Sequence, residues 1–426
     1  MERSEGLRGR VKIPGSKNSS LALMAASCLA DEPVRLNGVP AIADFKVIAD
    51  IGRDIGLLIR REAGGQVFVD PRSIHNATID PKKASLIRTS YYFAGALLAK
   101  FGKVSVGFPG GDNFVDRPID QHIKALTALG ASFVFHHDHY TVEAKRLTGA
   151  DIYFDTITSG ATINAMLAAC RAHGTTVLRN AAKDPEVVDT ANFLNSLGAN
   201  IRGAGTDTIR IEGVRYLSGG FHTVIPDRLI AGAFLIAAGA PGGHIIVEDV
   251  IPDHLRSCIA KLREIGVHVE IGDHSITACS TGVLRATRVR TAMYPGFATD
   301  LQQPLTALLA LAPGKSIVTD KIFPKRFGHV QQLRRMGASI EVRSGSAFIR
   351  GGVPLRGNIV HATDIRAGIC LLLAGLWADG STIITGVQHI ERGYENAVET
   401  FRSLGARIAE FNGDEEQFRH QHAYLS

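Results

Sequence analysis

The chain has 426 residues, of which 45% are hydrophobic and 21% are charged, and it contains 45 Gly but only 16 Pro. This composition excludes a disordered chain, a collagen-like chain and a small disulfide-rich scaffold, and the length suits two or three domains with their own cores. The formal net charge is +6, yet the basic residues are scattered and aromatic residues make up only 7%. We therefore expect the chain to bind small anions and not nucleic acid.

The sequence also lacks the segments that would direct it to a membrane. It has no run of about 18 apolar residues, the length that a membrane-spanning helix needs. Residues 1–18 contain no apolar stretch of the secretory-signal type, so we expect a cytoplasmic protein without membrane insertion. No Cys-x-x-Cys pair and no His at ligand spacing accompany the cysteines, so we expect reduced thiols and no metal. The five cysteines are Cys28, Cys170, Cys258, Cys279 and Cys370.

In chain order, the predicted elements repeat six times. Each repeat has an almost wholly apolar helix followed by a strand, at 20–36, 90–106, 162–178, 229–247, 301–318 and 365–384. An amphipathic helix follows and ends in a glycine, a residue that suits the left-handed position after a helix. These glycines lie 68 to 74 residues apart, at Gly56, Gly130, Gly198, Gly266, Gly337 and Gly405. After each glycine, alternating polar and apolar residues around a turn predict a strand pair.

A repeat of this length is too long for a typical solenoid unit and indicates a compact subdomain. Because a helix that is apolar all round must be buried on all sides, each repeat should combine one buried helix, one half-exposed helix and about four strands. The sequence therefore predicts an α/β fold with two lobes of three repeats each, in which sheets face solvent and the buried helices are bundled inside. We expect residues 17–226 in one lobe, and residues 1–16 with 227–426 in the other.

The residues that open the six buried helices are polar or charged: 17–19, 88–90, 159–162, 227–228, 299–300 and 363–366. A helix N-terminus carries about half a positive charge and unpaired N–H groups. If the helices run parallel, several such ends would face one cleft between the lobes. With Lys17, Arg88 and Arg366 nearby, that cleft would bind phosphates and carboxylates. The alternative is that the Ser, Thr and Asp residues only cap their helices and the cations are solvated.

Three other segments concentrate turn residues or ionisable side chains. Residues 109–122 are long, Gly-rich and polar, which is typical of an active-site lid near 109–120; the alternative is an ordinary surface loop. Residues 390–395 hold charged residues where a helix could start. The His-rich stretch 135–139 falls at a predicted hairpin turn whose side chains point to alternate sides, so we expect a solvated turn there and not a metal site.

Taken together, the helix starts, the Gly-rich segment and the charged segment at 390–395 closely resemble those of the enolpyruvyl transferases, and the resemblance extends over residues 8 to 408. The matching motifs are collinear and lie at 15–18, 88–92, 109–111, 117–122, 160–164, 184–186, 226–228, 295–300, 325–327 and 391–395. The family's fold is a two-lobed inside-out α/β barrel of six βαβαββ repeats, three in each lobe. The Gly-Ser-Lys-Asn motif at 15–18 and the loop 117–122 are similar to the branch that acts on sugar nucleotides, and less so to the shikimate-pathway branch.

The resemblance implies transfer of the enolpyruvyl group from phosphoenolpyruvate to the 3-hydroxyl of UDP-N-acetylglucosamine, with release of phosphate. This reaction is the first committed step of peptidoglycan synthesis, and it implies no metal and no organic cofactor. Two alternatives stay open. The acceptor could be another uridine nucleotide such as UMP in a secondary-metabolite pathway, or the chain could be a non-catalytic paralogue that binds a sugar nucleotide. The presence of Lys17, Asp300, Arg326 and Arg392 together argues against the non-catalytic alternative.

The resemblance also assigns roles to residues. Phosphoenolpyruvate would bind Lys17 and Arg117 through its phosphate, and Arg326, Arg366 and Arg392 through its carboxylate, which a planar guanidinium can hold bidentately. Asp300 stands where the family has the group that orients and deprotonates the acceptor hydroxyl. The catalytic residues would be Lys17, Asp112, Asp300 and Arg392. The sugar nucleotide would contact Asn18, Arg88, Arg117, Pro118, Asp120, Thr158, Ser159, Gly160 and Asp300.

Asp112 is the main departure from the family pattern, which usually has Cys after Pro-Gly-Gly. The thiol's proposed roles are acid chemistry at the donor and help with product release. A carboxyl group can also transfer protons, although an exposed Asp has a pKa of about 4 and is mostly ionised at neutral pH. Desolvation under a closed lid would raise the pKa of Asp112, whereas nearby arginines would lower it.

Asp112 predicts resistance to fosfomycin, because a carboxylate lacks the soft sulfur nucleophile that the epoxide alkylates. Prolonged incubation with the drug should therefore leave both the activity and the mass of the protein unchanged. Potent, time-dependent inactivation, with the added mass located at residue 112, would contradict this prediction.

Overall fold

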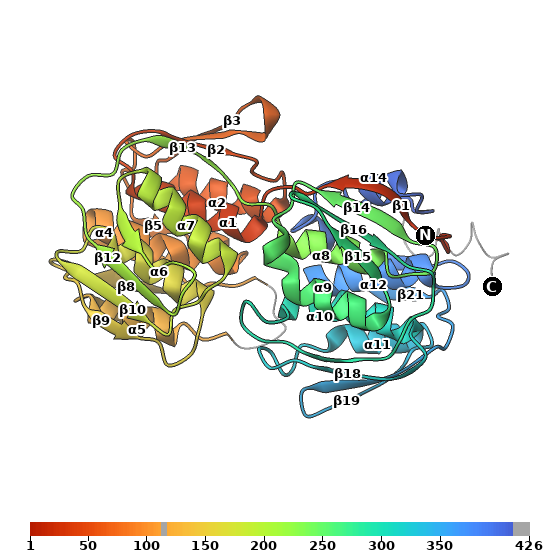
Figure 1. Cartoon of the computed structure of the whole chain (residues 1–426). Coiled ribbons are helices and arrows are strands. Elements are labelled where there is room, and N and C mark those ends of the chain that lie inside the picture. Colours follow the sequence, from red (N-terminus) through yellow and green to blue (C-terminus); the bar gives the residue numbers. More distant parts are fainter. Residues whose placement is uncertain (112–116, 412–426) are drawn as a thin grey trace. The chain divides into compact units, whose positions relative to one another are not determined.

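The computed structural model describes residues 1–111 and 117–411 and divides the chain into two compact units (Figure 1). The middle unit comprises Pro14–Asp227, and the terminal unit comprises Met1–Ile13 together with Arg228–Ser426. The chain therefore passes from one unit to the other twice, once after Ile13 and once after Asp227. The sequence placed these two crossings after residues 16 and 226.

The middle unit contains three four-stranded sheets, with strand orders β13-β2-β4-β3, β5-β6-β8-β7 and β11-β12-β10-β9. Its strands are β2 (Val34–Asn37), β3 (Leu58–Arg61), β4 (Val67–Asp70), β5 (Thr78–Ile79), β6 (Lys103–Gly107), β7 (Ser132–Phe135), β8 (His139–Glu143), β9 (Asp151–Tyr153), β10 (Thr175–Arg179), β11 (Asn200–Arg202), β12 (Thr208–Glu212) and β13 (Gly220–Thr223). Its α-helices are α1 (Lys17–Ala26), α2 (Ala43–Asp54), α3 (Pro81–Ala84), α4 (Tyr92–Phe101), α5 (Asp120–Ala128), α6 (Ser159–Ala169) and α7 (Pro185–Ser196).

Up to residue 411, the terminal unit contains two four-stranded sheets, β1-β14-β16-β15 and β17-β18-β20-β19, and the two-stranded sheet β21-β22. Its strands are β1 (Arg8–Lys12), β14 (His244–Glu248), β15 (His268–Ile271), β16 (Ser275–Cys279), β17 (Arg288–Arg290), β18 (Gly314–Thr319), β19 (Ser339–Arg343), β20 (Ser346–Gly351), β21 (Ile359–His361) and β22 (Ile383–Thr385). Its α-helices are α8 (Arg228–Ala237), α9 (Arg256–Ile265), α10 (Thr299–Leu311), α11 (Gly328–Arg335), α12 (Ile365–Trp377), α13 (Gln388–Glu391) and α14 (Ala397–Ser403).

This element order confirms six α/β repeats. Each four-stranded sheet has one parallel pair at an edge and two antiparallel pairs, as in β5-β6-β8-β7. Two strands pair with partners far away in the sequence. β1, near the N-terminus, joins a sheet of the terminal unit by pairing with β14, and β13 joins the first sheet of the middle unit by pairing with β2. In the sixth repeat, most of the strand pair expected after Gly405 falls on residues 412–426, outside the described residues. In the described part of the chain this repeat pairs only β21 with β22, while Glu2 forms isolated bridges to Ser381 and Arg407.

The apolar helices are buried as their composition predicts. All residues of α12 are buried, as are all residues of α6 except its first. In the middle unit α4 packs against α1 and α6, and in the terminal unit α10 packs against α8 and α12. Each of the six repeat glycines has φ between 90° and 105°, which confirms the left-handed conformation expected of them. Among the described residues, none of the helices has both the length and the hydropathy to cross a bilayer.

Candidate active site

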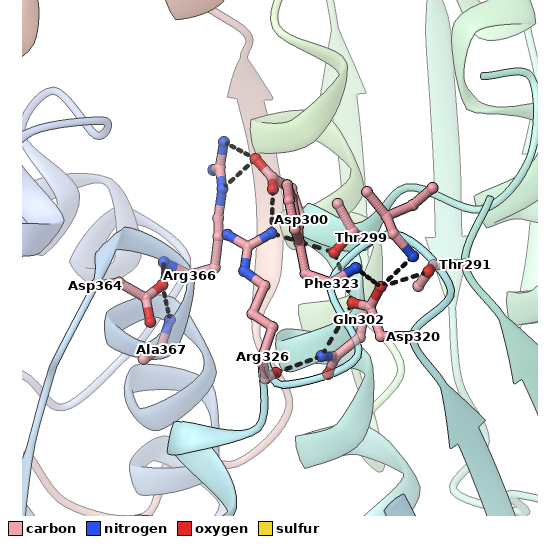
Figure 2. Close-up of polar contacts among 11 residues, drawn as sticks. Thr291, Thr299, Asp300, Gln302, Asp320, Phe323, Arg326, Asp364, Arg366 and Ala367 are labelled. Carbon is pink, nitrogen blue, oxygen red and sulfur yellow. Dashed lines mark hydrogen bonds and ion pairs between the residues drawn. The ribbon is translucent and has the colours of Figure 1, made fainter. Parts of the chain in front are cut away.

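A carboxylate held by two arginines lies at the N-terminus of α10 (Figure 2). Nη1 of Arg326 donates to Oδ1 of Asp300 at 2.6 Å, and Nε of Arg366 donates to Oδ2 at 2.9 Å. Nη2 of Arg366 also lies 2.9 Å from Oδ2, so this arginine binds the carboxylate through two nitrogens. The side chains of Arg326 and Arg366 are 4% and 7% exposed, and that of Asp300 is 25% exposed. Three of the residues predicted from the sequence are thus in direct contact.

The two guanidinium groups decide the charge state of Asp300. Burial alone would raise the pKa of this carboxyl group, but the attraction of Arg366 and Arg326, together with their hydrogen bonds, outweighs burial and holds the pKa well below its ordinary value. Asp300 is therefore ionised at neutral pH and, in this arrangement, is a weak base. The two arginines form a site that binds a carboxylate.

Asp320 organises the turn that leads to Arg326, and the sequence analysis missed it. It is 1% exposed and directly follows β18. Its Oδ1 accepts the backbone N–H groups of Ile322 and Phe323 at 2.9 and 2.8 Å, and its Oδ2 accepts the hydroxyl of Thr299 at 2.6 Å. These bonds tie the turn to the start of α10. An Asp directly after a buried strand and before a turn was the signal that could have identified it.

The helix that carries Arg366 begins with a side-chain cap. Asp364 is the N-cap of α12, and its Oδ1 accepts the backbone N–H groups of Arg366 and Ala367 at 2.9 and 3.1 Å. Asp364 therefore follows the capping alternative, whereas Arg366 turns its guanidinium to another side chain. Arg392, the third predicted carboxylate ligand, follows α13 and is partly buried.

In the middle unit, Lys17 opens α1 and is held by two carboxylates. Its Nζ forms a salt bridge with Oδ2 of Asp44 at 2.7 Å, and these side chains are only 11% and 5% exposed. Its backbone N–H donates to Oδ2 of Asp227 at 2.9 Å. The next residue, Asn18, is partly buried. The cation is thus fixed at a helix N-terminus, where an anion would have to compete with Asp44 for it.

Arg88 connects two segments that the sequence assigned to one binding site. It opens the short 3-10 helix η3 (Arg88–Tyr91), and its Nη2 donates to the backbone carbonyls of Arg117 and Pro118, the latter at 3.3 Å. Its guanidinium lies 5.7 Å from the ring centroid of Tyr91. Burial lowers the pKa of Arg88 from its usual high value. The structure thus brings together Arg88, Arg117 and Pro118.

The N-terminus of α6 carries the last group of predicted residues. Thr158 is at the N-cap position and makes no side-chain capping bond, while Oγ of Ser159 donates to Oδ2 of Asp184 at 2.8 Å. A Cβ on Gly160 would lie 2.5 Å from the hydroxyl oxygen of Tyr91, so any larger residue there would require Tyr91 to move. Asp120 is the exposed first residue of α5.

Some predictions fall outside these contacts. Asp112 and residues 113–116 of the expected lid lie outside the described residues. Within the described part of the chain, no group of three or more His, Cys, Asp or Glu side chains could hold a metal ion. All five cysteines are free, and only Cys279 is not fully buried.

The chain is similar to known proteins over almost its whole length. The EPSP synthase (3-phosphoshikimate 1-carboxyvinyltransferase) family matches residues 1–401. UDP-N-acetylglucosamine 1-carboxyvinyltransferase 2 of Geobacillus kaustophilus is 49% identical over 402 residues, covering 94% of each chain. The Bacillus subtilis protein of that name is 48% identical over 405 residues, covering 95% of this chain and 94% of the relative.

Two solved structures share the fold. The enolpyruvyl transferase NikO from Streptomyces tendae has a TM-score of 0.87 and 27% identity, covering 96% of this chain and 97% of that one. EPSP synthase from Acinetobacter baumannii has a TM-score of 0.72 and 17% identity, covering 95% and 97%.

The pairing of Asp300 predicts a pH-dependent contribution to stability. Asp300→Asn should lower the free energy of unfolding by about 2 kcal/mol, because two buried guanidinium groups lose their charged partner. A carboxyl group with a depressed folded pKa stabilises the fold above its unfolded pKa, about 4, and loses that contribution as the pH falls toward the folded value. The difference in the free energy of unfolding between wild type and Asp300→Asn should therefore be constant from about pH 5 to 8 and shrink below about pH 4.

Urea unfolding across this pH range measures the difference. Asp253→Asn is the matched control, because Asp253 pairs with Arg256 at the surface, where their side chains are 71% and 76% exposed. Its effect on stability should be small at every pH. An Asp300→Asn effect as small as that of the control would contradict the importance of the ion pair.

Proposed function

We propose a function from the premise that this chain belongs to the EPSP synthase family of enolpyruvyl (carboxyvinyl) transferases. The chain transfers the enolpyruvyl group of phosphoenolpyruvate to the 3-hydroxyl of UDP-N-acetylglucosamine and releases phosphate. The observation that carries the proposal is that Arg326 and Arg366 hold a carboxylate between two buried guanidinium groups, and the donor has such a carboxylate. The choice of UDP-N-acetylglucosamine as the acceptor is supported by two relatives named for it, which are 49% and 48% identical to this chain. The reaction is the first committed step of peptidoglycan synthesis and takes place in the cytoplasm.

Binding of the donor changes the environment of Asp300. The carboxylates of Asp300 and phosphoenolpyruvate are acceptors of the same kind, and both require the nitrogens of Arg326 and Arg366. When the donor carboxylate takes these nitrogens, Asp300 loses part of its ion pairing, and its pKa rises toward the ordinary value. A carboxylate with a higher pKa is a better general base. The donor thus activates the group that orients and deprotonates the acceptor hydroxyl.

The other predicted residues take roles that suit their chemistry. Lys17 and Arg117 bind the phosphate of the donor, and Arg392 adds a third guanidinium at its carboxylate. Lys17 then exchanges or shares its present partner, Asp44, just as the arginines exchange Asp300. The sugar nucleotide is held by Asn18, Arg88, Arg117, Pro118, Asp120, Thr158, Ser159, Gly160 and Asp300.

The reaction proceeds by addition and then elimination. The enol carbon of the donor gains a proton, for which Asp112 is the proposed acid. The hydroxyl oxygen of the acceptor then bonds to the neighbouring carbon, and the hydroxyl proton passes to Asp300. In the tetrahedral adduct, the carboxylate of Asp112 then takes a proton back from the carbon that it had protonated, while the bond to the phosphate oxygen breaks. The products are the enolpyruvyl ether and inorganic phosphate. Lys17 and Arg392 contribute to catalysis by stabilising the negative charge of the donor and of the leaving phosphate.

A screen of acceptors with labelled phosphoenolpyruvate tests the proposal. Phosphate release should be rapid with UDP-N-acetylglucosamine and near background with UMP, because the relatives that share almost half of the residues are named for the sugar nucleotide. Rapid release with UMP alone would instead establish the alternative acceptor. Absence of turnover with every acceptor, combined with tight nucleotide binding, would establish a non-catalytic paralogue.

A second prediction addresses Asp300 as the base. Asp300→Asn should retain binding of the sugar nucleotide yet reduce kcat by roughly 100-fold or more, as expected for loss of a positioned acid–base group. Steady-state kinetics with both substrates measure this effect, and Asp253→Asn serves as the control with unchanged kcat. A kcat close to that of wild type would remove Asp300 from the proposed role.

A further inference from the structure

A chain of hydrogen bonds crosses three helices of the middle unit and ends at a buried histidine. The backbone N–H of Gly95 in α4 donates to Oδ1 of Asn164 in α6 at 2.8 Å. Nδ2 of Asn164 lies 3.1 Å from Nδ1 of His122 in α5. Asn164 and His122 are 1% and 7% exposed. Each of the three residues therefore has a fixed partner inside the protein.

The chemistry of the donor groups fixes the direction of every bond in this chain. A backbone N–H can only donate, so the Asn164 atom that faces Gly95 must be its carbonyl oxygen. The amide nitrogen of Asn164 consequently faces His122 and donates to its Nδ1. Because Nδ1 accepts, a neutral His122 must carry its proton on Nε2. Gly95 permits this geometry, since a Cβ there would lie 2.5 Å from Oδ1 of Asn164.

The surroundings of His122 favour its neutral form. Burial, and then the charge of Arg88, lower the pKa of His122 to about 3, although Asp120 acts in the opposite direction. Tyr91 packs on the imidazole ring with 4.3 Å between the ring centroids. Arg88, Asp120 and Tyr91 are thus the ionisable groups that act on His122. Over the neutral pH range this residue is an uncharged donor.

Nε2 of His122 points to the N-terminus of α6. A Cβ added to Gly160 would lie 3.3 Å from this nitrogen and 2.5 Å from the hydroxyl oxygen of Tyr91. In residues 1–111 and 117–411, Asn164 is the one hydrogen-bond partner recorded for His122, and it binds Nδ1. The Nε2–H group is therefore left for a ligand at the start of α6, where backbone N–H groups also lack helical acceptors.

We propose that Asn164 is a positioning residue that fixes His122 as a neutral Nε2–H donor, and that this donor binds a diphosphate oxygen of the sugar nucleotide beside the N-terminus of α6. The identity of the ligand rests on the proposed function, whereas the tautomer is a property of the chain alone. The Nε2–H group of neutral His122 can donate a hydrogen bond to a ligand oxygen at this position without adding a positive charge to the site. Nucleotide binding therefore does not depend on titration of His122.

Nitrogen NMR of the full chain with 15N-labelled histidine tests the tautomer in the absence of any substrate. His122→Gln identifies the His122 signals by their loss. We expect a protonated Nε2 and an unprotonated Nδ1, unchanged between about pH 5.5 and 8, because burial opposes ionisation. A proton on Nδ1, or a titration within this range, would overturn the proposal, whichever acceptor the enzyme uses.

Asn164→Asp tests the positioning role. A carboxylate can only accept, so it would move the neutral proton of His122 to Nδ1 and favour the imidazolium. Calorimetric binding of UDP-N-acetylglucosamine should then weaken by about tenfold at pH 8, as expected for the loss of one hydrogen bond, and recover as the pH falls. The control is Asn192→Asp, the same change at an exposed position of α7. Wild-type affinity in Asn164→Asp at pH 8 would overturn the proposal.

Two variants of His122 distinguish a role as hydrogen-bond donor from a role in packing alone. His122→Gln keeps an N–H donor and should retain affinity for the nucleotide within about threefold, whereas His122→Leu should lose about tenfold. KM for the nucleotide should rise in His122→Leu more than kcat falls. Equal losses in both variants would show that the imidazole only fills space. If Asn164→Asp does not fold, the NMR measurement and this pair still decide the proposal.

Discussion

A helix that is apolar on every side has to be enclosed, and this constraint shapes both the fold and the candidate site. Once such a helix is surrounded by sheets and other helices, its first turn is the part that retains unpaired N–H groups and can carry polar side chains. Lys17, Asp300 and Arg366 stand in the first two positions of α1, α10 and α12. The charged residues gather at helix starts because the remainder of each helix must be apolar.

The cations of the candidate site are already paired with carboxylates within the protein. Lys17 is paired with Asp44, and Arg326 and Arg366 are paired with Asp300, all at 2.6 to 2.9 Å. Burying a guanidinium or ammonium group without a partner costs several kcal/mol, so a protein that keeps such groups for an anionic ligand needs a substitute anion in the absence of the ligand. Side-chain carboxylates serve this purpose. The ligand then exchanges one ion pair for another.

Much of the architecture could be predicted from the sequence because it is encoded locally. Each repeat carries an apolar helix, an amphipathic helix and the glycine that ends it, and this order recurs along the chain. The positive φ of Gly56 and its five counterparts follows from this pattern. The expected lobe boundaries already put β1 and β13 in the units where they lie. Their pairing with β14 and β2 could not be predicted, because the strands are similar and either pairing satisfies the same alternation.

The site was predicted in part for the same reason. Residue types indicated anion binding, but contacts between distant residues, such as Arg366 with Asp300 66 positions away, are set by packing and leave no periodic signal. Asp44 and Asp320 were missed because a single Asp in a first turn or after a strand is common. What such residues do depends on which partners the fold brings to them.

The two groups of binding residues differ in what a ligand must displace. The arginines of the terminal unit bind a full negative charge on Asp300, so an incoming carboxylate gains only the difference between two similar ion pairs. Arg88 in the middle unit donates to the neutral carbonyls of Arg117 and Pro118, and His122 offers a neutral N–H. A ligand oxygen there replaces weaker, uncharged partners or water, so more of the interaction energy remains as affinity. Under the proposed function, tight binding is therefore expected from the residues that hold the nucleotide. Under the same proposal, the residues that hold phosphoenolpyruvate convert its binding into a change in the basicity of Asp300, which is the property that the proposed reaction needs.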